Sequence, residues 1–302
     1  MTAAFNSRPV EGILWTFGAG ILFVGVNILV KYLGPVMPAP EMAFIRYGLG
    51  LMLLVPAIRQ IMRIRLSPRQ WGLFALRGGL HAAGVALWFY AMATIPLADV
   101  TAMNYLSPIY VTIGAALFMG EKLAVRRILA VVVALVGAVV ILRPGFREIG
   151  PGHYAMLIAA VVFAGSYLLA KRLTDETDPV AVITMLSVSV TIGLVPIAAI
   201  DWVTPTGWQL LVLLATAGFA TLGHYLMTLG FRAAPITVTQ PVTFLQLVWA
   251  VLAGYVLFDE AVDPYVVLGG VMIISAISFI TWREHVLKRR QITPPVPPQK
   301  LT

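Results

Sequence analysis

Long apolar stretches alternate with short polar linkers over most of the chain. The apolar stretches end at clusters of charge or at Pro and Gly residues, and no linker is long enough to hold a soluble domain. A helix needs about 20 apolar residues to cross the hydrocarbon core of a bilayer. We therefore predict an all-α integral membrane protein with ten transmembrane helices, over residues 12–33, 40–58, 71–94, 98–119, 125–142, 152–172, 179–200, 207–231, 236–257 and 263–282.

The composition supports this class and excludes others. Hydrophobic residues make up 60% of the chain and charged residues 11%, whereas soluble domains average about 45–50% and 25%. A soluble enzyme, a nucleic-acid-binding protein and a disordered chain therefore fit poorly. The chain has no cysteine, so it has neither disulfides nor thiolate metal ligands. We expect no metal site and no cofactor, and the absence of a GxxxxGK[ST] loop argues against direct use of ATP.

The distribution of Lys and Arg predicts the orientation in the membrane. If the N-terminal segment 1–11 is cytoplasmic, sixteen basic residues fall on the cytoplasmic side and three on the other, namely Lys31, Arg143 and Arg147. This bias follows the positive-inside rule. The basic, Pro-rich tail 283–302 then also lies in the cytoplasm. We predict a multi-pass protein of a bacterial-type inner membrane, and the +8 net charge gives no reason to expect a nucleic-acid partner.

Two halves of the chain resemble each other at a nearly constant offset. Phe23-Val24-Gly25 aligns with Phe163-Ala164-Gly165, and further along the chain Glu121 aligns with Glu260 at almost the same offset. The repeating units are 12–142 and 152–282, each with five predicted spans. Because five is odd, the second unit must cross the membrane in the opposite sense. Such inverted repeats are typical of secondary transporters, whose binding site lies near the midplane between the halves.

The repeated motifs resemble a known family. Ser107-Pro108 and Gly120-Glu121-Lys122-Leu123, followed in the second unit by the run 240–250 and Phe258-Asp259-Glu260, resemble the EamA-type repeat of the drug/metabolite transporter superfamily. The second-unit block is similar to bacterial inner-membrane exporters of amino acids, the aromatic amino-acid type among them. The resemblance implies outward transport and no enzymatic activity.

The sequence departs from the family pattern at two positions. Asp259 replaces the usual Gly, and Leu247 stands where Pro108 of the first unit predicts a proline. We therefore expect the helix distortion of the second unit elsewhere, for example at Pro241. Glu121 and Glu260 lie at opposite ends of the spans, where they could cap the following helix or close a gate.

Polar residues inside the spans are the candidate binding residues. His81 lies about 15 Å into its span at 1.5 Å per residue, and an unpaired polar group at that depth is costly. Pro108 frees a backbone carbonyl in a span that also carries polar side chains. Helix packing remains the alternative for each residue, and interface snorkelling for Arg46 and Arg77. The predicted substrate-binding set is Arg77, His81, Trp88, Asn104, Tyr105, Ser107, Tyr167, His224, Gln246 and Trp249; no catalytic or metal-binding residue is predicted.

The absence of acidic residues from the middle of the predicted spans limits the kinds of substrate that the protein can transport. No Asp or Glu lies in the central part of a predicted span, which disfavours a proton-coupled pump of organic cations. The embedded charge is basic and suits a substrate with a carboxylate. We predict a secondary transporter that exports small zwitterionic metabolites, most plausibly amino acids, by alternating access. Its partners are a small-molecule substrate and the lipid bilayer, and no obligatory protein partner is evident.

Two alternatives remain open at this point. A carrier of nucleotide-like metabolites or nucleotide sugars would use Arg46 or Arg77 to bind phosphate. An intramembrane enzyme could pair Ser107 with His81, although no GxSxG motif supports it.

Overall fold

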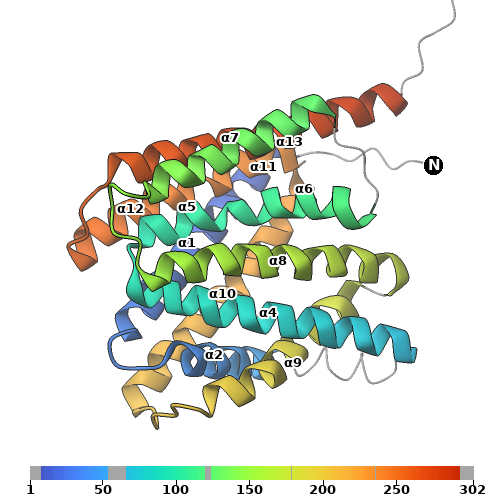
Figure 1. Cartoon of the computed structure of the whole chain (residues 1–302). Helices are drawn as coiled ribbons and strands as arrows, with labels where there is room; N and C mark the ends of the chain where they lie inside the picture. Colours follow the sequence, from blue (N-terminus) through green and yellow to red (C-terminus); the bar gives the residue numbers. More distant parts are fainter. Residues whose placement is uncertain (1–7, 54–65, 120–123, 178, 235, 293–302) are drawn as a thin grey trace, which may run out of the picture.

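The computed structural model describes residues 8–53, 66–119, 124–177, 179–234 and 236–292. These residues form α-helices joined by short connections, and the only β-type pairing among them is an isolated bridge between Pro144 and Arg147. Most of the helices run along one common direction (Figure 1). The helices are α1 (Pro9–Leu33), α2 (Ala39–Leu53), α4 (Pro68–Thr94), α5 (Leu97–Asn104), α6 (Leu106–Met119), α7 (Val125–Leu142), α8 (Pro151–Glu176), α9 (Pro179–Ala198), α10 (Gly207–Ala233), α11 (Ile236–Thr243), α12 (Leu245–Phe258) and α13 (Pro264–Ile292).

Eight helical segments of the described chain are long and apolar enough to cross a membrane. They coincide with eight of the ten predicted spans, and α5–α6 and α11–α12 each count as one segment. The two other predicted spans correspond to α2, whose described part has 15 residues, and to α9, which contributes a shorter apolar helix over Thr184–Ala198. The structure thus confirms an all-helical membrane protein, while the full set of ten spans stays a prediction.

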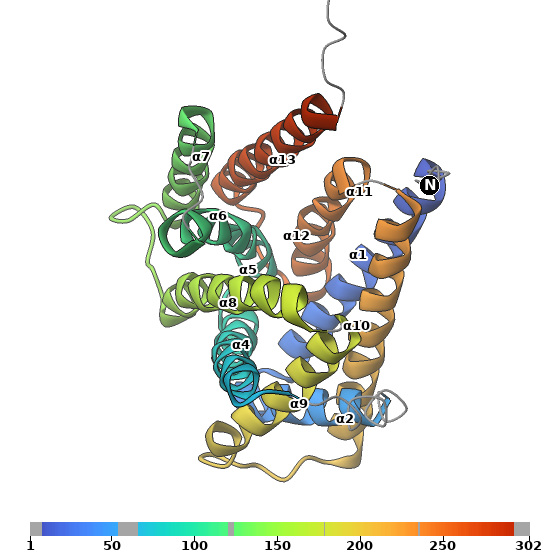
Figure 2. The same cartoon turned by 90° about the vertical axis from the view of Figure 1, so that its right-hand side faces the viewer.

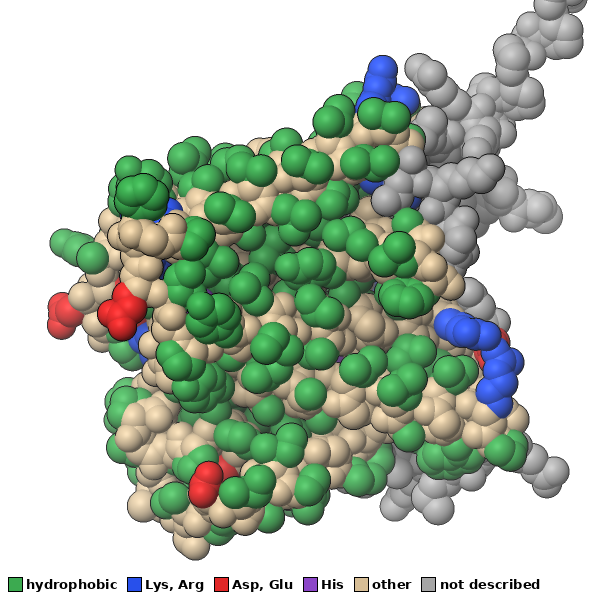
Figure 3. All heavy atoms as spheres, in the orientation of Figure 1, with side chains coloured by type: hydrophobic (Ala, Val, Ile, Leu, Met, Phe, Trp, Pro, Cys, Tyr) green, Lys and Arg blue, Asp and Glu red, His purple; other side chains and the backbone are tan. Residues whose placement is uncertain are grey.

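The outer surface of the bundle is apolar between its two ends. Hydrophobic side chains cover most of the visible face in Figure 3, and the charged side chains gather near the ends of the helices. On this face Lys and Arg lie mainly where α4 begins and α8 ends. We call this end of the bundle the inner end and the opposite end, with the connections 34–38 and 143–150, the outer end. The names follow the orientation predicted from the charges.

Helix pairs from the two halves of the chain form the centre of the bundle. α1 packs along α10, and α4 packs along α8. α7 and α13 form a separate pair at one side, which is clear when the molecule is viewed along its helices (Figure 2). The α7–α13 crossing is close because Gly137 and Gly269 meet there, where a Cβ on Gly269 would lie 2.4 Å from the carbonyl oxygen of Gly137. Small residues of this kind allow helices in a membrane to approach closely.

The contacts between the halves occur in corresponding pairs. Phe23 of α1 fits against Gly223 of α10, where an added Cβ would lie 3.1 Å from its ring. Phe163 of α8 fits against Gly84 of α4, where the distance would be 2.8 Å. The alignment of the two halves pairs Phe23 with Phe163 and Gly84 with Gly223. The repeat detected in the sequence therefore corresponds to the same aromatic-on-glycine contact made twice.

Two of the helical segments are interrupted at corresponding positions. The first break separates α5 from α6 at Tyr105, and the second separates α11 from α12 at Phe244, the position that aligns with Tyr105 in the second unit. Pro108 explains the first break, because a proline cannot donate to the carbonyl four residues earlier and its ring crowds that carbonyl. The second break follows Pro241 and is bridged by hydrogen bonds from Phe244 N to Pro241 O and from Leu247 N to Phe244 O. It therefore forms without a proline at the position that corresponds to Pro108.

An ion pair joins the two halves at the outer end. Lys31 Nζ at the end of α1 lies 2.5 Å from Glu260 Oε1 and donates a hydrogen bond to the carbonyl of Ile95 at 2.8 Å. The other oxygen of Glu260 accepts from the backbone N–H of Leu97 at 2.9 Å. Leu97 is the first residue of α5, so Glu260 caps a helix of the other half rather than the helix that follows it in sequence.

The residue before Glu260 has the backbone conformation that the family motif implies. Asp259 ends α12 with φ 53° and ψ 31°, the left-handed region. Glycine is favoured there because it has no Cβ, and Asp is among the few other residues that tolerate the conformation. The departure from the family pattern at this position is thus structurally compatible with the turn.

A second charged network lies at the outer end. Asp99, which is buried in α5, receives Arg147 Nη2 at 2.5 Å and lies 3.0 Å from His153 Nε2. Arg143 pairs with Asp263, and Arg147 Nη1 lies 3.8 Å from the same carboxylate. The network ties the connection between α7 and α8 to the start of α13 and to α5. The sequence alone predicts none of these contacts.

Candidate functional site

His81 lies on the face of α4 that packs against α8. Its Nδ1 is 3.2 Å from the hydroxyl oxygen of Ser166, which is itself fully buried. The imidazole ring contacts Phe163, with ring centres 5.0 Å apart, and Tyr167, with centres 6.3 Å apart. Phe163 and Tyr167 stack nearly parallel on one another. His81 thus has the polar partner that its depth requires, and it borders an aromatic surface formed by the second half.

His224 occupies a related position on α10. Its Nδ1 donates to the carbonyl of Ala220 at 2.7 Å, and its ring meets Phe23 of α1 edge-on at 4.9 Å. Phe23 and Phe163 are the two repeat-related phenylalanines. Each of them therefore packs against a histidine from the opposite half of the chain.

The two helix breaks meet each other. Tyr105 and Phe244 have ring centres 5.4 Å apart and nearly perpendicular planes. The Tyr105 hydroxyl donates to the backbone carbonyl of Thr243 at 3.2 Å. The residues at which the two interrupted segments change course are therefore in direct contact, and the hydroxyl of one binds a carbonyl at the end of α11.

The second-half candidates on α12 face α1. Gln246 lies against Gly20, where an added Cβ would be 3.4 Å from its Cγ. Trp249 meets Phe17 edge-on at 6.0 Å. α1 therefore contributes to the same region, as the predicted position of the site between the halves requires.

The remaining predicted residues differ in their surroundings. Asn104 is half-buried at the end of α5, and Trp88 packs edge-on against its neighbour Phe89 at 5.7 Å. Ser107 is 4% exposed, and its hydroxyl has no hydrogen-bond partner in the described part of the chain. Ser107 and His81 form no hydrogen bond there, since His81 contacts Ser166 instead.

The two arginines of the first half have different environments. Arg77 is buried, and its Nη1 donates to the carbonyl of Val182 at 2.8 Å, which ties α4 to α9. Arg46 is half-buried in the middle of α2, with its guanidinium 4.1 Å from the ring centre of Tyr47. The sequence favours Arg77 as a substrate ligand, but its guanidinium is engaged in helix packing, whereas Arg46 makes no such bond to the described residues.

These residues lie on helices that pack against one another across the two halves. α4, which carries Arg77 and His81, packs against α2 and α8, and α2, which carries Arg46, packs against α10, which carries His224. The group combines α2 and α4 of the first half with α8 and α10 of the second. It is basic, because its charged side chains are Arg46 and Arg77. The described residues include no cluster of three or more His, Asp or Glu side chains that could hold a metal ion.

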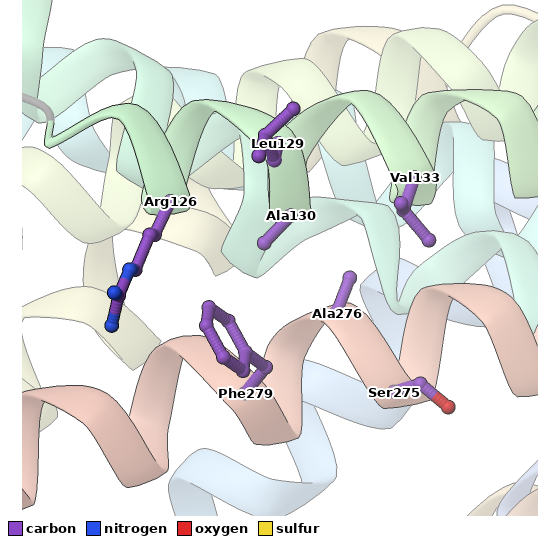
Figure 4. Close-up of a pocket in the computed structure, with 7 residues that line it drawn as sticks. All are labelled: Arg126, Leu129, Ala130, Val133, Ser275, Ala276 and Phe279. Carbon is purple, nitrogen blue, oxygen red and sulfur yellow. The ribbon is translucent and has the colours of Figure 1, made fainter.

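A groove of about 280 Å³ lies elsewhere, between α7 and α13 (Figure 4). It opens to the outer surface, because Leu129 and Val133 on its wall are 59% and 42% exposed. None of the predicted binding residues lines it. The groove is therefore separate from the central group around His81. Its lining is Arg126, Leu129, Ala130, Val133, Ser275, Ala276 and Phe279.

Sequence reasoning missed several residues of the central region. Ser166, the partner of His81, has no distinctive spacing in the sequence. Phe163 and Phe23 are part of the aligned repeat motif, so the alignment of the halves could have identified them as a contact pair. Phe244 could have been found as the position that corresponds to Tyr105.

The fold and the central residues together define a polytopic membrane protein of the transporter class. The model of the EamA-like transporter family matches the chain twice, over residues 10–143 and 150–282. The chain therefore belongs to this family, as its motifs predicted, and it is a transporter rather than an enzyme.

Several named relatives cover almost the whole chain. A riboflavin transporter of Vibrio cholerae is 28% identical over 95% of this chain and 98% of its own length. An S-adenosylmethionine uptake transporter of Rickettsia bellii is 26% identical over 93% of this chain and 97% of its own. The pseudopaline exporter CntI of Pseudomonas aeruginosa is 28% identical over 88% and 94%. A solved crystal structure, 17% identical, shares the fold with a TM-score of 0.59 over 94% of this chain and 99% of its own.

Proposed function

We propose that this protein is a secondary carrier that works by alternating access, with ten spans arranged as two inverted five-helix repeats. The substrate site lies between α4, α5–α6, α10 and α11–α12, with contributions from α1 and α8. The observation that carries this proposal is the pair of corresponding contacts, Phe23 on Gly223 and Phe163 on Gly84. Each half places a phenylalanine on a glycine of the other half, and two halves related in this way around a shared centre are suited to rock against one another.

We propose a substrate with a planar aromatic or heteroaromatic part and polar groups at its edge. Rings surround the region from several helices, including Tyr167, Trp249 and the Tyr105–Phe244 pair. Offset stacking and edge-on contacts with such side chains favour flat ligands. The names of two relatives, a riboflavin transporter and an S-adenosylmethionine transporter, describe substrates with heteroaromatic rings.

An aromatic amino acid is the second candidate substrate, with export as the direction. It is favoured by the basic character of the central group, which suits a carboxylate. The relatives include both an uptake transporter and an exporter, so direction has to be measured.

Counterflow into proteoliposomes tests the proposal. Purified protein would be reconstituted and loaded with unlabelled riboflavin, S-adenosylmethionine, tyrosine or a nucleotide sugar, and uptake of the same labelled compound measured. We expect exchange of at least one of the first three, and loss of that exchange in His81→Ala with normal yield and monodisperse elution. Exchange of the nucleotide sugar alone would favour a nucleotide carrier over both named candidates, exchange of none of the four compounds would refute the proposed substrate class, and unchanged exchange in His81→Ala would remove His81 from the site.

A further inference from the structure

We infer that Arg46 is the anchor for an anionic group on the substrate, so that the carrier selects organic acids, carboxylates or phosphates, over neutral molecules with the same ring system. This inference rests on the proposed transport function and names the substrate class of that same central site. It replaces Arg77, the arginine that the sequence favoured, with one whose hydrogen-bonding groups are available.

Arg46 is placed well inside the bundle. It is the eighth residue of α2 counted from Ala39, which corresponds to a depth of roughly 10 Å from the outer end at 1.5 Å per residue. Its guanidinium lies over the ring of the adjacent Tyr47, 4.1 Å from the ring centre, and α2 packs against α4 and α10, the helices that carry His81 and His224. A snorkelling arginine would place its charge in the interface, away from these mid-span residues.

The guanidinium lacks a balancing carboxylate. In the part of the chain that the structure describes, Arg46 forms no ion pair and no hydrogen bond, and its one direct partner is the Tyr47 ring. The acidic residue on the same helix, Glu41, is fully buried and accepts from the backbone N–H of Val203 at 2.9 Å. An uncompensated charge within a membrane-spanning bundle is costly and is retained where it serves a function. A ring-stacked guanidinium still presents its N–H edge, which can bind a carboxylate or phosphate through two parallel hydrogen bonds.

The surroundings of Arg46 favour an acid with an aromatic part. α2 packs against α4, and His81 on α4 contacts the rings of Phe163 and Tyr167, which stack on one another along α8. An anionic group at Arg46 would therefore place the remainder of a small ligand beside rings from α8. His81 and His224, on two helices that pack against α2, carry no negative charge.

Arg77 could not serve equally well. Its Nη1 is already bound to the Val182 carbonyl, and the side chain is 6% exposed. Releasing it for a ligand would break this hydrogen bond and loosen the α4–α9 contact, which carries a cost of its own. Arg77 contributes positive charge to the region, and Arg46 contributes the contact.

Matched ligand pairs test the inference on the purified full-length protein. Dissociation constants would be measured by calorimetry for riboflavin and riboflavin 5′-phosphate, and for tyramine and tyrosine. Within each pair the ring is constant and the anionic group is added. We expect the wild type to bind the acid more tightly by roughly 10- to 100-fold in at least one pair, and the pair in which this occurs distinguishes phosphate from carboxylate.

Three variants locate the effect. Arg46→Gln is expected to remove the preference for the acid, and Arg46→Lys to retain part of it, because the charge is kept while the paired N–H groups are lost. Arg126→Gln, at the peripheral groove, is the matched control and is expected to leave the preference unchanged. An unaltered preference in Arg46→Gln overturns the inference.

The wild type alone also decides the question, should Arg46→Gln fail to fold. A wild type that, in both pairs, binds the member without the added anionic group at least as tightly as the member with it overturns the inference but leaves the proposed function standing. A wild type that binds none of the four probes overturns the inference, and the counterflow assay, which also includes S-adenosylmethionine, then decides separately whether the proposed function stands.

Discussion

The ion pair between Lys31 and Glu260 offers a quantitative test of how the two halves are held together at the outer end. The perturbation is Glu260→Gln, which removes the charge but retains an oxygen for the N–H of Leu97. Lys31 and Glu260 are 14% and 12% exposed, so the variant leaves an ammonium group largely shielded from water and without its counter-charge. Removing one partner of a buried pair costs about 3–5 kcal/mol.

The expected loss is smaller than that range, because Lys31 keeps its hydrogen bond to the carbonyl of Ile95. We expect a destabilisation of about 2–3 kcal/mol for Glu260→Gln. Lys31→Met should cost a similar amount, since it strands the carboxylate. The double variant should be less destabilised than the sum of the two, by at least about 1 kcal/mol, as expected for directly coupled residues.

Thermal unfolding in detergent, followed through the fluorescence of the seven tryptophans, provides the assay. Glu11→Gln is the control, because Glu11 pairs with Arg8 while both side chains are at least half exposed, and such a surface pair contributes about 0–1 kcal/mol. If the Lys31 and Glu260 variants add up independently, or if Glu260→Gln unfolds at the wild-type midpoint, the pair does not hold the halves together.

Three further predictions concern packing, the helix breaks and the orientation. Gly78→Ala should lower the unfolding midpoint markedly, because the added Cβ would lie 2.2 Å from Ser189 Cβ. Gly79→Ala has nothing within 4 Å of the added Cβ and should leave the midpoint unchanged or raise it. Equal midpoints for the two variants would contradict the close α4–α9 contact. Tyr105→Phe keeps the ring contact with Phe244 but removes the hydrogen bond to Thr243, so a loss of about 1 kcal/mol is expected in the same unfolding assay, and no loss would mean that this bond contributes nothing. Phe146→Cys, at a side chain 91% exposed, should react with an impermeant maleimide from the extracytoplasmic side and Arg172→Cys from the cytoplasmic side, and labelling of both from one side would disprove the predicted topology.

The helical segments were predictable because the membrane imposes a simple rule. Backbone groups in the hydrocarbon core must form hydrogen bonds within the segment, which requires a helix, and the surrounding lipid requires apolar side chains. Each span therefore has a long apolar sequence. The break at Tyr105 also followed from a local feature, Pro108. The break at Phe244 was predictable only in part: Pro241 indicated a distortion nearby, but no proline stands at the position that corresponds to Pro108. The break packs against Tyr105 and is bridged by hydrogen bonds between residues three apart. That contact joins residues from opposite halves of the chain.

The candidate site was only partly predictable for the same reason. The depth of His81 from the membrane surface, counted along its predicted span, identified it as a candidate. In the structure its partner is the buried hydroxyl of Ser166. Depth did not distinguish Arg46 from Arg77, since both lie within a few helical turns of an interface, and only the Val182 carbonyl shows which one is engaged. Glu260 was expected to cap its own following helix, and the three-dimensional arrangement instead places it at the start of α5. A local sequence pattern cannot show which residues of the other half a side chain will contact.

The charged network around Asp99 is not shared between the two repeats. The positions that correspond to Asp99 and Asp263 are Val238 and Ala124, which carry no charge. Among the described residues, this charged network has no counterpart at the repeat-related positions, so it stabilises the closed state of the outer end in a way that the repeat does not mirror. We therefore expect the outer end, where Arg147 and His153 lie, to be closed more often than open. We also expect its opening to be the slower conformational step of each transport cycle. A substrate that enters from the outer end must then supply enough binding free energy to offset the loss of this charged network. A substrate that enters from the inner end does not have to break it.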